Sequence, residues 1–463
     1  MINLHKGVMI TVKPKKKQLA GWGNYPKESC YIYRPETLGE LKGLIKDADV
    51  DSQIAYGLGR SYGDTALNKD SGVIGTDRLN HFLEFDEEKQ TLTCEAGVSL
   101  ADVIDVFLPR GYFPGVTPGT TYVTIGGAIA NDVHGKNHHS DGSFSEYVLS
   151  FDLMIADGSI VTCSRTENEE LFWATIGGIG LTGIILKATI QLIPVESSYI
   201  KATYEKARNL DDAFEKFIEN DANFKYSVAW IDCLSTGDSL GRSVLMRGDH
   251  ARADELPAKI KKPLGSPDKP GLKMPVNAPG IALNYWSISA FNQLYYSSYK
   301  DETKIVDAAS FFHPLDSIED WNKLYGKKGF VQYQAVFPKD REPKKGLRKV
   351  LERLTEEKRS SFLAVLKSSG AQNAGMLSFP MEGYTLALDI PIKDDGLFPF
   401  LKELDEIVLA HGGRVYLAKD AVLDADTFRE MYPRWEEFLR VKQQVDPDGR
   451  FASSMSRRLG LTE

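Results

Sequence analysis

Apolar and polar positions in the first half of the chain alternate between helical and strand periods. Residues 35–48 begin with a proline and place four aliphatic side chains on one predicted helical face: Leu38, Leu41, Leu44 and Ile45. Residues 151–163 read FDLMIADGSIVTC, and Asp157–Gly158 between two apolar runs predicts a β-hairpin with a two-residue turn. The mixture of short strands and helices up to about Val195 is typical of an α+β nucleotide-binding domain.

One glycine pattern in this half has the spacing of a dinucleotide fingerprint. Gly178, Gly180 and Gly183 form GxGxxG. The apolar segment before them, 170–176, predicts a helix, and ILKATIQLI after them predicts a strand. The fingerprint needs a strand, then the glycines, then a helix. Because the order is reversed, the pattern predicts no nicotinamide site here.

The pattern changes after residue 196. Strand-like and helical pieces alternate over 199–250, and residues 257–280 then contain six prolines and five lysines, which predicts a loop. Twelve aromatic residues follow within 285–333, and most of them are expected in a core. TLALDIPI (385–392) predicts a strand, and residues 398–413 predict a helix that ends at Gly412–Gly413.

Composition narrows the class of protein. With 463 residues the chain is long enough for two domains. It carries 56 Lys and Arg against 64 Asp and Glu, a net charge of −8, which argues against a nucleic-acid partner. Its four cysteines show no CxxC motif and no disulfide pattern, so we expect reduced structural thiols.

The same sequence bears on localisation. No apolar run reaches the roughly 18 residues of a membrane-spanning helix. The N-terminal lysines follow a short apolar patch, whereas a secretory signal has them before a longer one, so we expect a cytoplasmic start. Four of these lysines could contact an acidic membrane surface or belong to a solvated tail: Lys13, Lys15, Lys16 and Lys17.

Two glycine-rich stretches are the strongest chemical signal. Residues 55–68 read AYGLGRSYGDTALN, and residues 118–144 contain PGTTYVTIGGAIANDVHGKNHH. Such turns let backbone N–H groups approach a large polar ligand, and Arg60 could add positive charge. Tight turns without a ligand are the alternative reading. The spacing matches neither the Walker loop nor the Rossmann fingerprint.

Together with six further blocks, these stretches resemble the vanillyl-alcohol-oxidase, or PCMH-type, superfamily of FAD-binding proteins. Within it the chain is similar to the family of polyprenyl-phosphoryl-ribose 2′-oxidases. The further blocks are GWG (21–23), ELFWATIGGIGLTGIILKATI (170–190), GFVQYQ (329–334), LAVLKSSG (363–370), VYLAKD (415–420) and VDPDGRFASSMSRRL (445–459).

The resemblance implies a two-domain α+β fold with an inserted antiparallel-sheet substrate domain, or cap. We expect an FAD-binding domain at 1–195, the cap at 196–413, and a return to the FAD-binding domain at 414–463. The implied FAD contacts are Ala55, Gly57, Leu58, Gly59, Arg60, Ser61, Tyr62, Gly63, Asp64, Gly119, Thr120, Thr124, Ile125, Gly126, Gly127, Asn131, Asp132, Val133, His134, Ile185, Tyr416 and Lys419.

The resemblance also assigns the residues of the reaction. Lys419 in VYLAKD matches the strand of a catalytic lysine, and a lysine at an apolar strand end can have a lowered pKa. His134 and Lys136 match the junction of cofactor and substrate, and Tyr62 is expected near the flavin or the pocket floor. Lys367, Gln332 and Gln334 suit a phosphate and sugar hydroxyls. Trp230 and Phe312 are expected as pocket walls.

Each of these residues has a simpler reading, namely an exposed lysine, a strand glutamine or core packing of the aromatic rings. A metal site at His134, His138 and His139 is disfavoured. The i,i+4 spacing suits a helix, but glycine and asparagine make this segment a loop, and no carboxylate and cysteine set completes a site.

Two departures from the family pattern carry predictions. Covalently flavinylated relatives have histidine where this chain has Arg60, so we expect noncovalent FAD. Ala387 stands where well-known members have the cysteine that nitroaromatic inhibitors modify, so we expect turnover without that covalent inhibition.

The main functional hypothesis is FAD-dependent oxidation of the 2′-hydroxyl of a polyprenyl-phosphoryl-β-D-ribose to the 2-keto sugar, the first half of an epimerisation that supplies arabinose for cell-envelope arabinan. Expected partners are a separate NAD(P)H-dependent reductase, quinone or oxygen as electron acceptor, and peripheral membrane contact on the cytoplasmic or periplasmic face. A soluble aldonolactone or alditol oxidase, or a non-catalytic flavoprotein subunit, are the alternatives.

Overall fold

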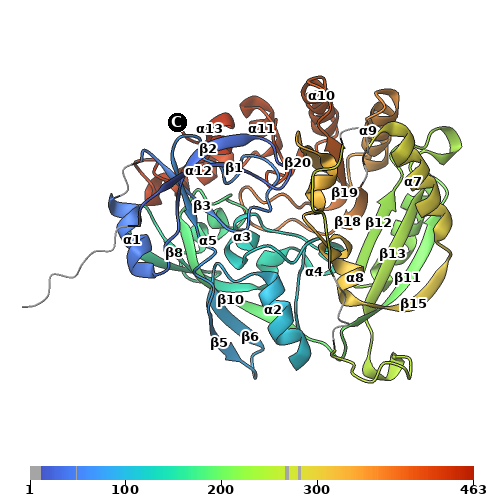
Figure 1. Ribbon diagram of the computed structural model, residues 1–463, viewed down its shortest axis with the longest axis horizontal. Coiled ribbons are helices and arrows are strands. Elements are labelled where there is room, and N and C mark those ends of the chain that lie inside the picture. Colours follow the sequence, from blue (N-terminus) through green and yellow to red (C-terminus); the bar gives the residue numbers. More distant parts are fainter. Residues whose placement is uncertain (1–11, 48–49, 266–270, 280–282, 360, 362) are drawn as a thin grey trace, which may run out of the picture.

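The computed structural model describes residues 12–463 except 48–49, 266–270, 280–282, 360 and 362. Two sheets make up the part of the molecule on the left of Figure 1. The first has the order β1 (Lys15–Ala20), β2 (Lys27–Tyr33), β4 (Gly72–Gly75) and β3 (Gln53–Tyr56). The second has the order β5 (Phe82–Asp86), β6 (Thr91–Glu95), β10 (Ile184–Pro194), β8 (Val148–Met154) and β9 (Ile160–Ser164), with β7 (Tyr112–Pro114) beside β10.

Short helices connect these strands, and their ends carry local signals. Ser99 and Asp102 form a capping box at the start of α2, and Thr124 caps α3 by accepting a hydrogen bond from the Gly127 N–H. The helices of this part are α1 (Leu38–Asp47), α2 (Leu100–Phe107), α3 (Ile125–Ala130), α4 (His138–Asp141) and α5 (Glu169–Thr175).

An eight-stranded antiparallel sheet forms the other part, on the right of Figure 1. Its order is β15 (Glu302–Asp307), β11 (Tyr199–Ala207), β13 (Ser243–His250), β12 (Tyr226–Ile231), β18 (Ala364–Ser369), β19 (Gly383–Pro391), β17 (Phe330–Pro338) and β20 (Arg414–Val415). A two-stranded parallel pair lies apart from it, β14 (Leu272–Lys273) with β16 (Ile318–Glu319).

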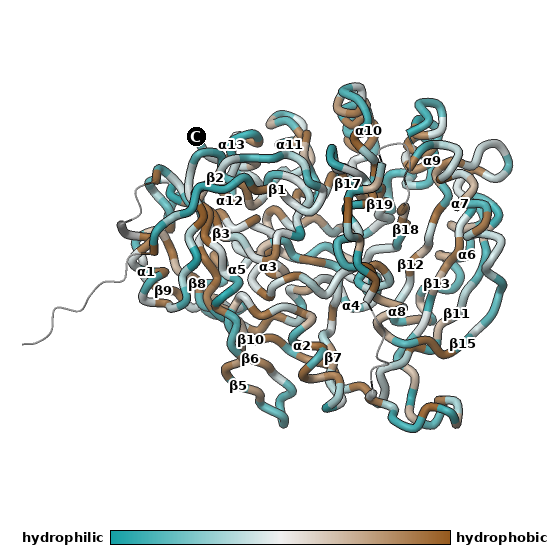
Figure 2. The backbone as a smooth tube through the Cα atoms, viewed as in Figure 1, coloured by the Kyte–Doolittle hydropathy of each residue, from teal (hydrophilic) through white to brown (hydrophobic). Residues whose placement is uncertain are grey.

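The two faces of this sheet belong to different apolar clusters. Ala229 and Leu245 pack into the main core, whereas their neighbours Trp230 and Val244 pack into a second, aromatic cluster. This alternation follows from the period of two along a strand. α6 (Leu210–Asn220), α9 (Pro343–Glu356) and α10 (Leu397–Ala410) cover the first face, and α7 (Tyr285–Ser298) and α8 (Ala308–Phe312) contribute to the second. In Figure 2 the apolar positions concentrate along the strands and the inner helical faces.

The end of the chain packs against its beginning. It forms α11 (Ala425–Met431), α12 (Trp435–Val445) and α13 (Ser454–Arg458). Arg458 pairs with Asp64, and Phe451 forms a β-bridge with Gln53. The α+β class with an antiparallel second part is confirmed. The division at 195 and 413 remains a prediction, which this arrangement of sheets supports.

Most of the predicted elements are present, with two local differences. The helix at 38–47 buries Leu41, Leu44 and Ile45, but Leu38 is 45% exposed because it lies in the first turn. The hairpin of β8 and β9 is present, but its turn is one residue longer than predicted. Ile155 N–H donates to the Ser159 carbonyl, so Ala156–Gly158 form a three-residue turn, with Gly158 at φ 80°.

The remaining predictions concern surfaces and thiols. All four cysteines are buried and free, as expected. The lysines at 15–17 begin strand β1 rather than a tail, and Lys16 pairs with Asp70. The described part of 257–280 is loop apart from β14, while 266–270 and 280 lie outside the described residues. In the described chain, no helix combines the length and apolar character that a bilayer crossing requires.

Candidate active site

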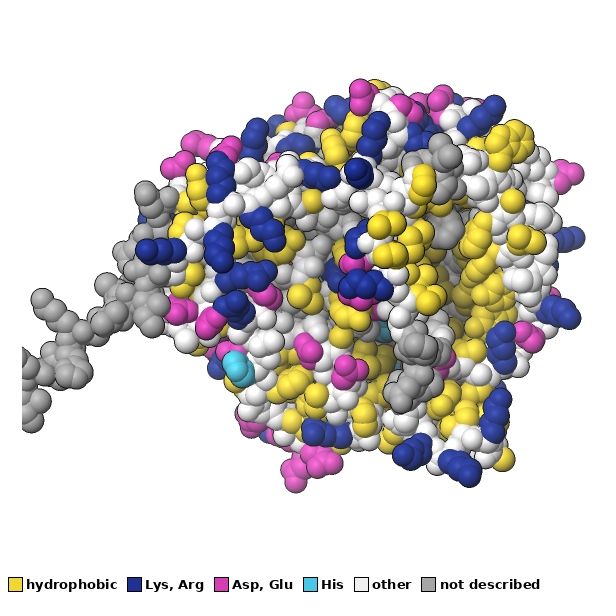
Figure 3. Space-filling view, viewed as in Figure 1, with side chains coloured by type: hydrophobic (Ala, Val, Ile, Leu, Met, Phe, Trp, Pro, Cys, Tyr) yellow, Lys and Arg dark blue, Asp and Glu magenta, His cyan; other side chains and the backbone are white. Residues whose placement is uncertain are grey.

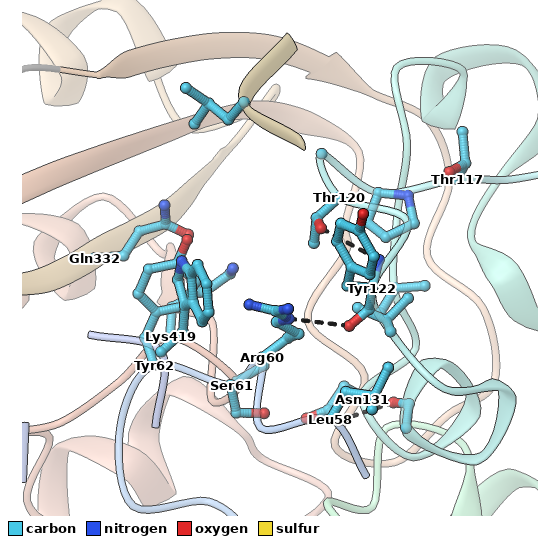
Figure 4. Close-up of a pocket in the computed structure, with 18 of the residues that line it drawn as sticks. Leu58, Arg60, Ser61, Tyr62, Thr117, Thr120, Tyr122, Asn131, Gln332 and Lys419 are labelled. Carbon is cyan, nitrogen blue, oxygen red and sulfur yellow. Dashed lines mark hydrogen bonds between the residues drawn. The ribbon is translucent and has the colours of Figure 1, made fainter. Parts of the chain in front are cut away.

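A cavity of about 750 Å³ lies between the glycine-rich loops and one face of the eight-stranded sheet. Figure 3 shows apolar side chains gathered around a hollow on the side of that sheet, and Figure 4 shows its wall in close-up. Nineteen of the 22 predicted FAD contacts and all ten predicted reaction residues line this cavity. None of the four cysteines does.

The two glycine-rich loops meet. A side chain at Gly57 would place its Cβ 2.5 Å from the Thr124 hydroxyl, so only glycine allows the two loops to approach this closely. Arg60 donates to the Tyr122 carbonyl at 3.2 Å (Figure 4). Its guanidinium carbon lies 3.8 Å from the centre of a Trp22 ring. Arg60 therefore bridges the two loops, and burial lowers its pKa.

Three predicted FAD contacts do not line the cavity. Asp64 is buried against Arg458, 2.6 Å away, and so ties the first loop to the last helix. Ile125 is fully buried in the main core. Asp132 accepts hydrogen bonds from Ser378 and Asn373. The side chains of these three residues pack or pair within the protein, whereas residues next to them in the sequence line the cavity.

The register of the large sheet explains why distant residues share one wall. Gln332 and Gln334 on β17 lie opposite Asp389 and Ala387 on β19. Val365 on β18 pairs with Ala387, and Trp230 on β12 pairs with Val365. Because side chains two apart point to the same face, one face of the sheet brings all of these groups except the buried Asp389 to the cavity.

Lys419 lies in a turn after β20, not in the strand that the sequence predicts, because its N–H donates to the Tyr416 carbonyl. Its Nζ lies 3.9 Å from the centre of the Tyr62 ring (Figure 4). Desolvation lowers the pKa of Lys419 to about 7, and the charge of Lys367 acts in the same direction. Asp389 opposes this shift.

His134 is held in its neutral form. Burial, with the positive charges of Lys367 and Lys419, lowers its pKa well below the usual value. Gln334 donates its amide to His134 Nε2 at 2.8 Å, which assigns the ring proton to Nδ1. Nδ1 is buried and has no hydrogen-bond partner within the protein. A bound ligand could accept from it.

Two further lysines lie on the cavity wall. Burial lowers the pKa of Lys367 to about 8. Burial together with Lys367 lowers the pKa of Lys136 to about 7. Lys136 donates to the Phe311 carbonyl and lies over that ring at 4.5 Å. An anion would offset the desolvation of both groups.

Other predicted residues have mixed roles. Tyr416 lines the cavity, and its hydroxyl donates to the Asn131 carbonyl at 2.7 Å. Trp230 and Phe312 also line the cavity, and both are packed in the aromatic cluster. Their positions are therefore compatible with a pocket wall and with core packing. Gly180 and Gly183 of the reversed fingerprint lie between α5 and β10, as their order predicts, and still line this cavity.

The three histidines do not converge as ligands. The His134 and His138 ring centres lie 6.3 Å apart, and His138 Nδ1 accepts from the Gly370 N–H. His139 hydrogen-bonds the Phe224 carbonyl. Within the described ranges, no three His, Cys, Asp or Glu side chains are grouped as a metal site would require.

Several residues at or behind the cavity wall were not predicted from the sequence. Asp389 lies behind Gln332, fully buried, and accepts from its amide. The segment after α8 closes on the second glycine loop, where Asp316 accepts from Thr121 at 2.7 Å and His313 hydrogen-bonds Thr117 at 2.7 Å. A lone carboxylate in the apolar run TLALDIPI was the available signal for Asp389. Nothing local marked the other contacts, because they join residues almost 200 positions apart.

The residues present fit a flavin dinucleotide. Glycine loops provide close backbone approach, and the buried Asn131 Oδ1 and His134 Nδ1 lack protein partners. The FAD binding domain family matches residues 30–164, and the D-arabinono-1,4-lactone oxidase family matches residues 393–459. Fold, site and family match define the class: the protein is an FAD-dependent oxidoreductase with a PCMH-type FAD-binding fold.

Individual relatives narrow the family. Decaprenylphosphoryl-β-D-ribose oxidase of Mycolicibacterium smegmatis is 40% identical over 96% of this chain and 98% of its own length. An uncharacterised protein of Streptomyces coelicolor is 34% identical over 79% of this chain and 100% of its own. L-gulonolactone oxidase of Scyliorhinus torazame is 24% identical over 94% of this chain and 97% of its own. The chain belongs to the decaprenylphosphoryl-β-D-ribose oxidase family.

Proposed function

We propose that the protein oxidises the 2′-hydroxyl of a polyprenyl-phosphoryl-β-D-ribose to the 2-keto sugar. The main support for this proposal is the positive charge of the side chains that line the cavity. Lys136, Lys367 and Arg60 line it as cationic groups. The acidic residues among the described lining are already engaged: Asp316 with Thr121, Glu319 with Lys273 and Asp320 with Lys323. This excess of positive charge favours a substrate that carries phosphate over a neutral sugar.

Roles follow from position. Lys367 and Lys136 would bind the phosphate, and Gln332 and Gln334 would bind sugar hydroxyls. FAD, when bound, would accept the hydride from C2′. The neutral amine of Lys419 would accept the proton of the 2′-hydroxyl, since a pKa of about 7 suits a base near neutral pH. The resulting ammonium would place positive charge beside the reduced cofactor.

Arg60 supports noncovalent FAD, because it occupies the position of the flavin-linked histidine and is engaged with Tyr122 and Trp22. Acid precipitation should leave the yellow colour in the supernatant. Colour retained on the precipitated protein would contradict this.

The decisive experiment is anaerobic mixing of the purified protein with synthetic prenylphosphoryl-ribose, ribitol or gulonolactone. Bleaching of the flavin by the phosphoryl-ribose is the expected result, and it would also exclude a non-catalytic subunit. The match to lactone oxidases at 393–459 makes a soluble aldonolactone oxidase the second candidate. Bleaching by gulonolactone and not by the phosphoryl-ribose would establish that candidate instead.

The partners follow from the same reaction. A separate NAD(P)H-dependent reductase would complete the epimerisation, and quinone or oxygen would reoxidise the flavin. Lys259, Lys261 and Lys262 are exposed in the basic loop and would contact a lipid surface. Co-sedimentation with anionic vesicles, but not with neutral ones, is the expected result. Equal recovery in both supernatants would argue against membrane contact.

A further inference from the structure

A buried carboxylate lies behind the cavity wall at Asp389. Its side chain is fully buried, and burial raises its pKa to about 7. Gln332 donates its amide to Oδ1, and the Tyr325 hydroxyl donates to Oδ2 at 3.5 Å. Asp389 does not line the cavity, so its contacts with a ligand are indirect.

A continuous set of contacts leads from Asp389 to Lys419. Gln332 donates to Asp389, its side chain lies beside Tyr62 (Figure 4), and the Tyr62 ring lies under Lys419 Nζ at 3.9 Å. Tyr62 is further fixed by an edge contact with Phe330 at 5.4 Å. Packing contacts thus lead from Lys419 through Tyr62 and Gln332 to a carboxylate that does not line the cavity.

Titratable groups around Lys419 lie on five elements or loops. Lys367 on β18 carries positive charge below about pH 8. His134 after α3 is neutral because burial lowers its pKa, and Tyr62 and Tyr325 are neutral because burial raises their pKa values well above normal. Asp389 on β19 is the group whose negative charge opposes the desolvation of Lys419. A nearby opposite charge favours the charged form of an amine.

We propose that Asp389 is a positioning residue that stabilises the Lys419 ammonium and orients Gln332 with its carbonyl oxygen toward the substrate. Donation of one amide N–H to Asp389 fixes the orientation of the Gln332 amide and turns its carbonyl oxygen away from the carboxylate, where that oxygen can accept a sugar hydroxyl. The inference rests on the proposed role of Lys419 in the reaction.

The test compares Asp389→Asn with the wild-type holoenzyme. The substitution keeps the shape and removes the charge, so the ammonium of Lys419 should be lost at lower pH. Two readouts are followed. The first is the pH inflection of anaerobic flavin reduction by prenylphosphoryl-ribose, and the second is the flavin midpoint potential against pH, measured with an artificial reductant and no substrate. Both inflections should move to lower pH by about 1 unit.

Asp405→Asn is the matched control, because Asp405 is also buried and accepts from a tyrosine, Tyr333, at 2.9 Å, outside the cavity. It should leave both inflections in place. Asp389→Glu should retain most of the wild-type profile. Tyr325→Phe should shift both inflections in the same direction by less, and it provides the answer if Asp389→Asn does not fold.

Superimposable potential-against-pH curves for the wild type and the folded variant, Asp389→Asn or Tyr325→Phe, would overturn the inference. The potential measurement uses no substrate, so its result does not depend on whether the proposed substrate is correct. If the proposed substrate is wrong, prenylphosphoryl-ribose will not reduce the flavin of the wild-type protein.

Discussion

The side-chain amide of Gln334 lies 2.8 Å from His134 Nε2, although 200 residues separate them along the chain. This hydrogen bond joins the large sheet to the second glycine loop and selects the Nδ1-protonated form of the imidazole. It is a point at which the two parts of the molecule depend on each other.

Replacing this amide should impair the reaction and spare the fold. Gln334→Leu removes the donor to a buried ring nitrogen, a loss of about 1–3 kcal/mol, so kcat/KM should fall about tenfold or more with normal FAD content. Gln191→Leu removes an amide that donates to Lys89 outside the cavity and serves as the control. Equal kcat/KM for Gln334→Leu and the wild type would contradict this role.

Because the two glycine-rich loops approach closely at Gly57, a side chain at this position should weaken FAD binding. Gly57→Ala would drive Cβ against Thr124 at 2.5 Å, whereas a Cβ at Gly43 in α1, away from the cavity, meets nothing within 4 Å. We expect a reduced FAD-to-protein ratio for Gly57→Ala and a normal ratio for Gly43→Ala, measured by absorbance after gel filtration. Identical ratios would show that the loops tolerate separation.

Lys367, one of the two lysines that we assign to the phosphate, predicts a pH dependence of the reaction. The pKa of Lys367 is lowered to about 8, so its ammonium is present below pH 8 and lost above it. The kcat/KM for prenylphosphoryl-ribose should therefore fall above pH 8, and Lys367→Met should be slow and lack this inflection. Lys339→Met alters an exposed lysine paired with Glu382 and should retain the wild-type profile. If Lys367→Met kept the inflection near pH 8, the inflection would belong to a group other than Lys367.

We expect residue 387 to determine the response to nitroaromatic inhibitors. It lines the cavity opposite Gln334, and no cysteine does, so the wild type should form no adduct. Ala387→Cys should gain a covalent adduct at residue 387, detected by mass spectrometry of the intact protein after turnover. An adduct on the wild-type protein at this strand would contradict the prediction.

Substitution of Asp64 distinguishes a role of this residue in stability from a role in FAD binding. It is 6% exposed and pairs with Arg458, so Asp64→Ala leaves a largely buried guanidinium with one partner fewer and should lower the free energy of unfolding by about 3 kcal/mol. Chemical denaturation measures this loss. FAD content should stay normal at temperatures where the variant is folded. A loss of FAD without a loss of stability would restore the original assignment of Asp64 to the cofactor.

Local sequence patterns predicted many of the helices and strands. The helix at 38–47, the strand at 383–391 and the helix that ends before Gly412 follow from the spacing of apolar residues and from helix-ending glycines. The order of helix, glycines and strand around Gly180 excluded a Rossmann site for the same reason. The one-residue error in the hairpin turn arose because a glycine in the left-handed region is compatible with both turn lengths.

The family motifs located the cavity but not the function of every residue in them. Asp64, Ile125 and Asp132 lie within matching motifs, yet their side chains point into packing or ion pairs. Motif spacing fixes where the backbone runs, whereas the direction of each side chain depends on what surrounds it after folding.

The amino-acid sequence by itself therefore determined the α+β class, the two glycine loops, the FAD-binding family and the basic side chains available to the site. Only the tertiary structure decided that Gln332 and Asp389 lie opposite each other, that Asp316 closes on Thr121, and that Lys419 lies over Tyr62. Strand register and loop closure join residues that are far apart in the chain. Their energies depend on burial and charge in the folded protein, which no local window of sequence contains.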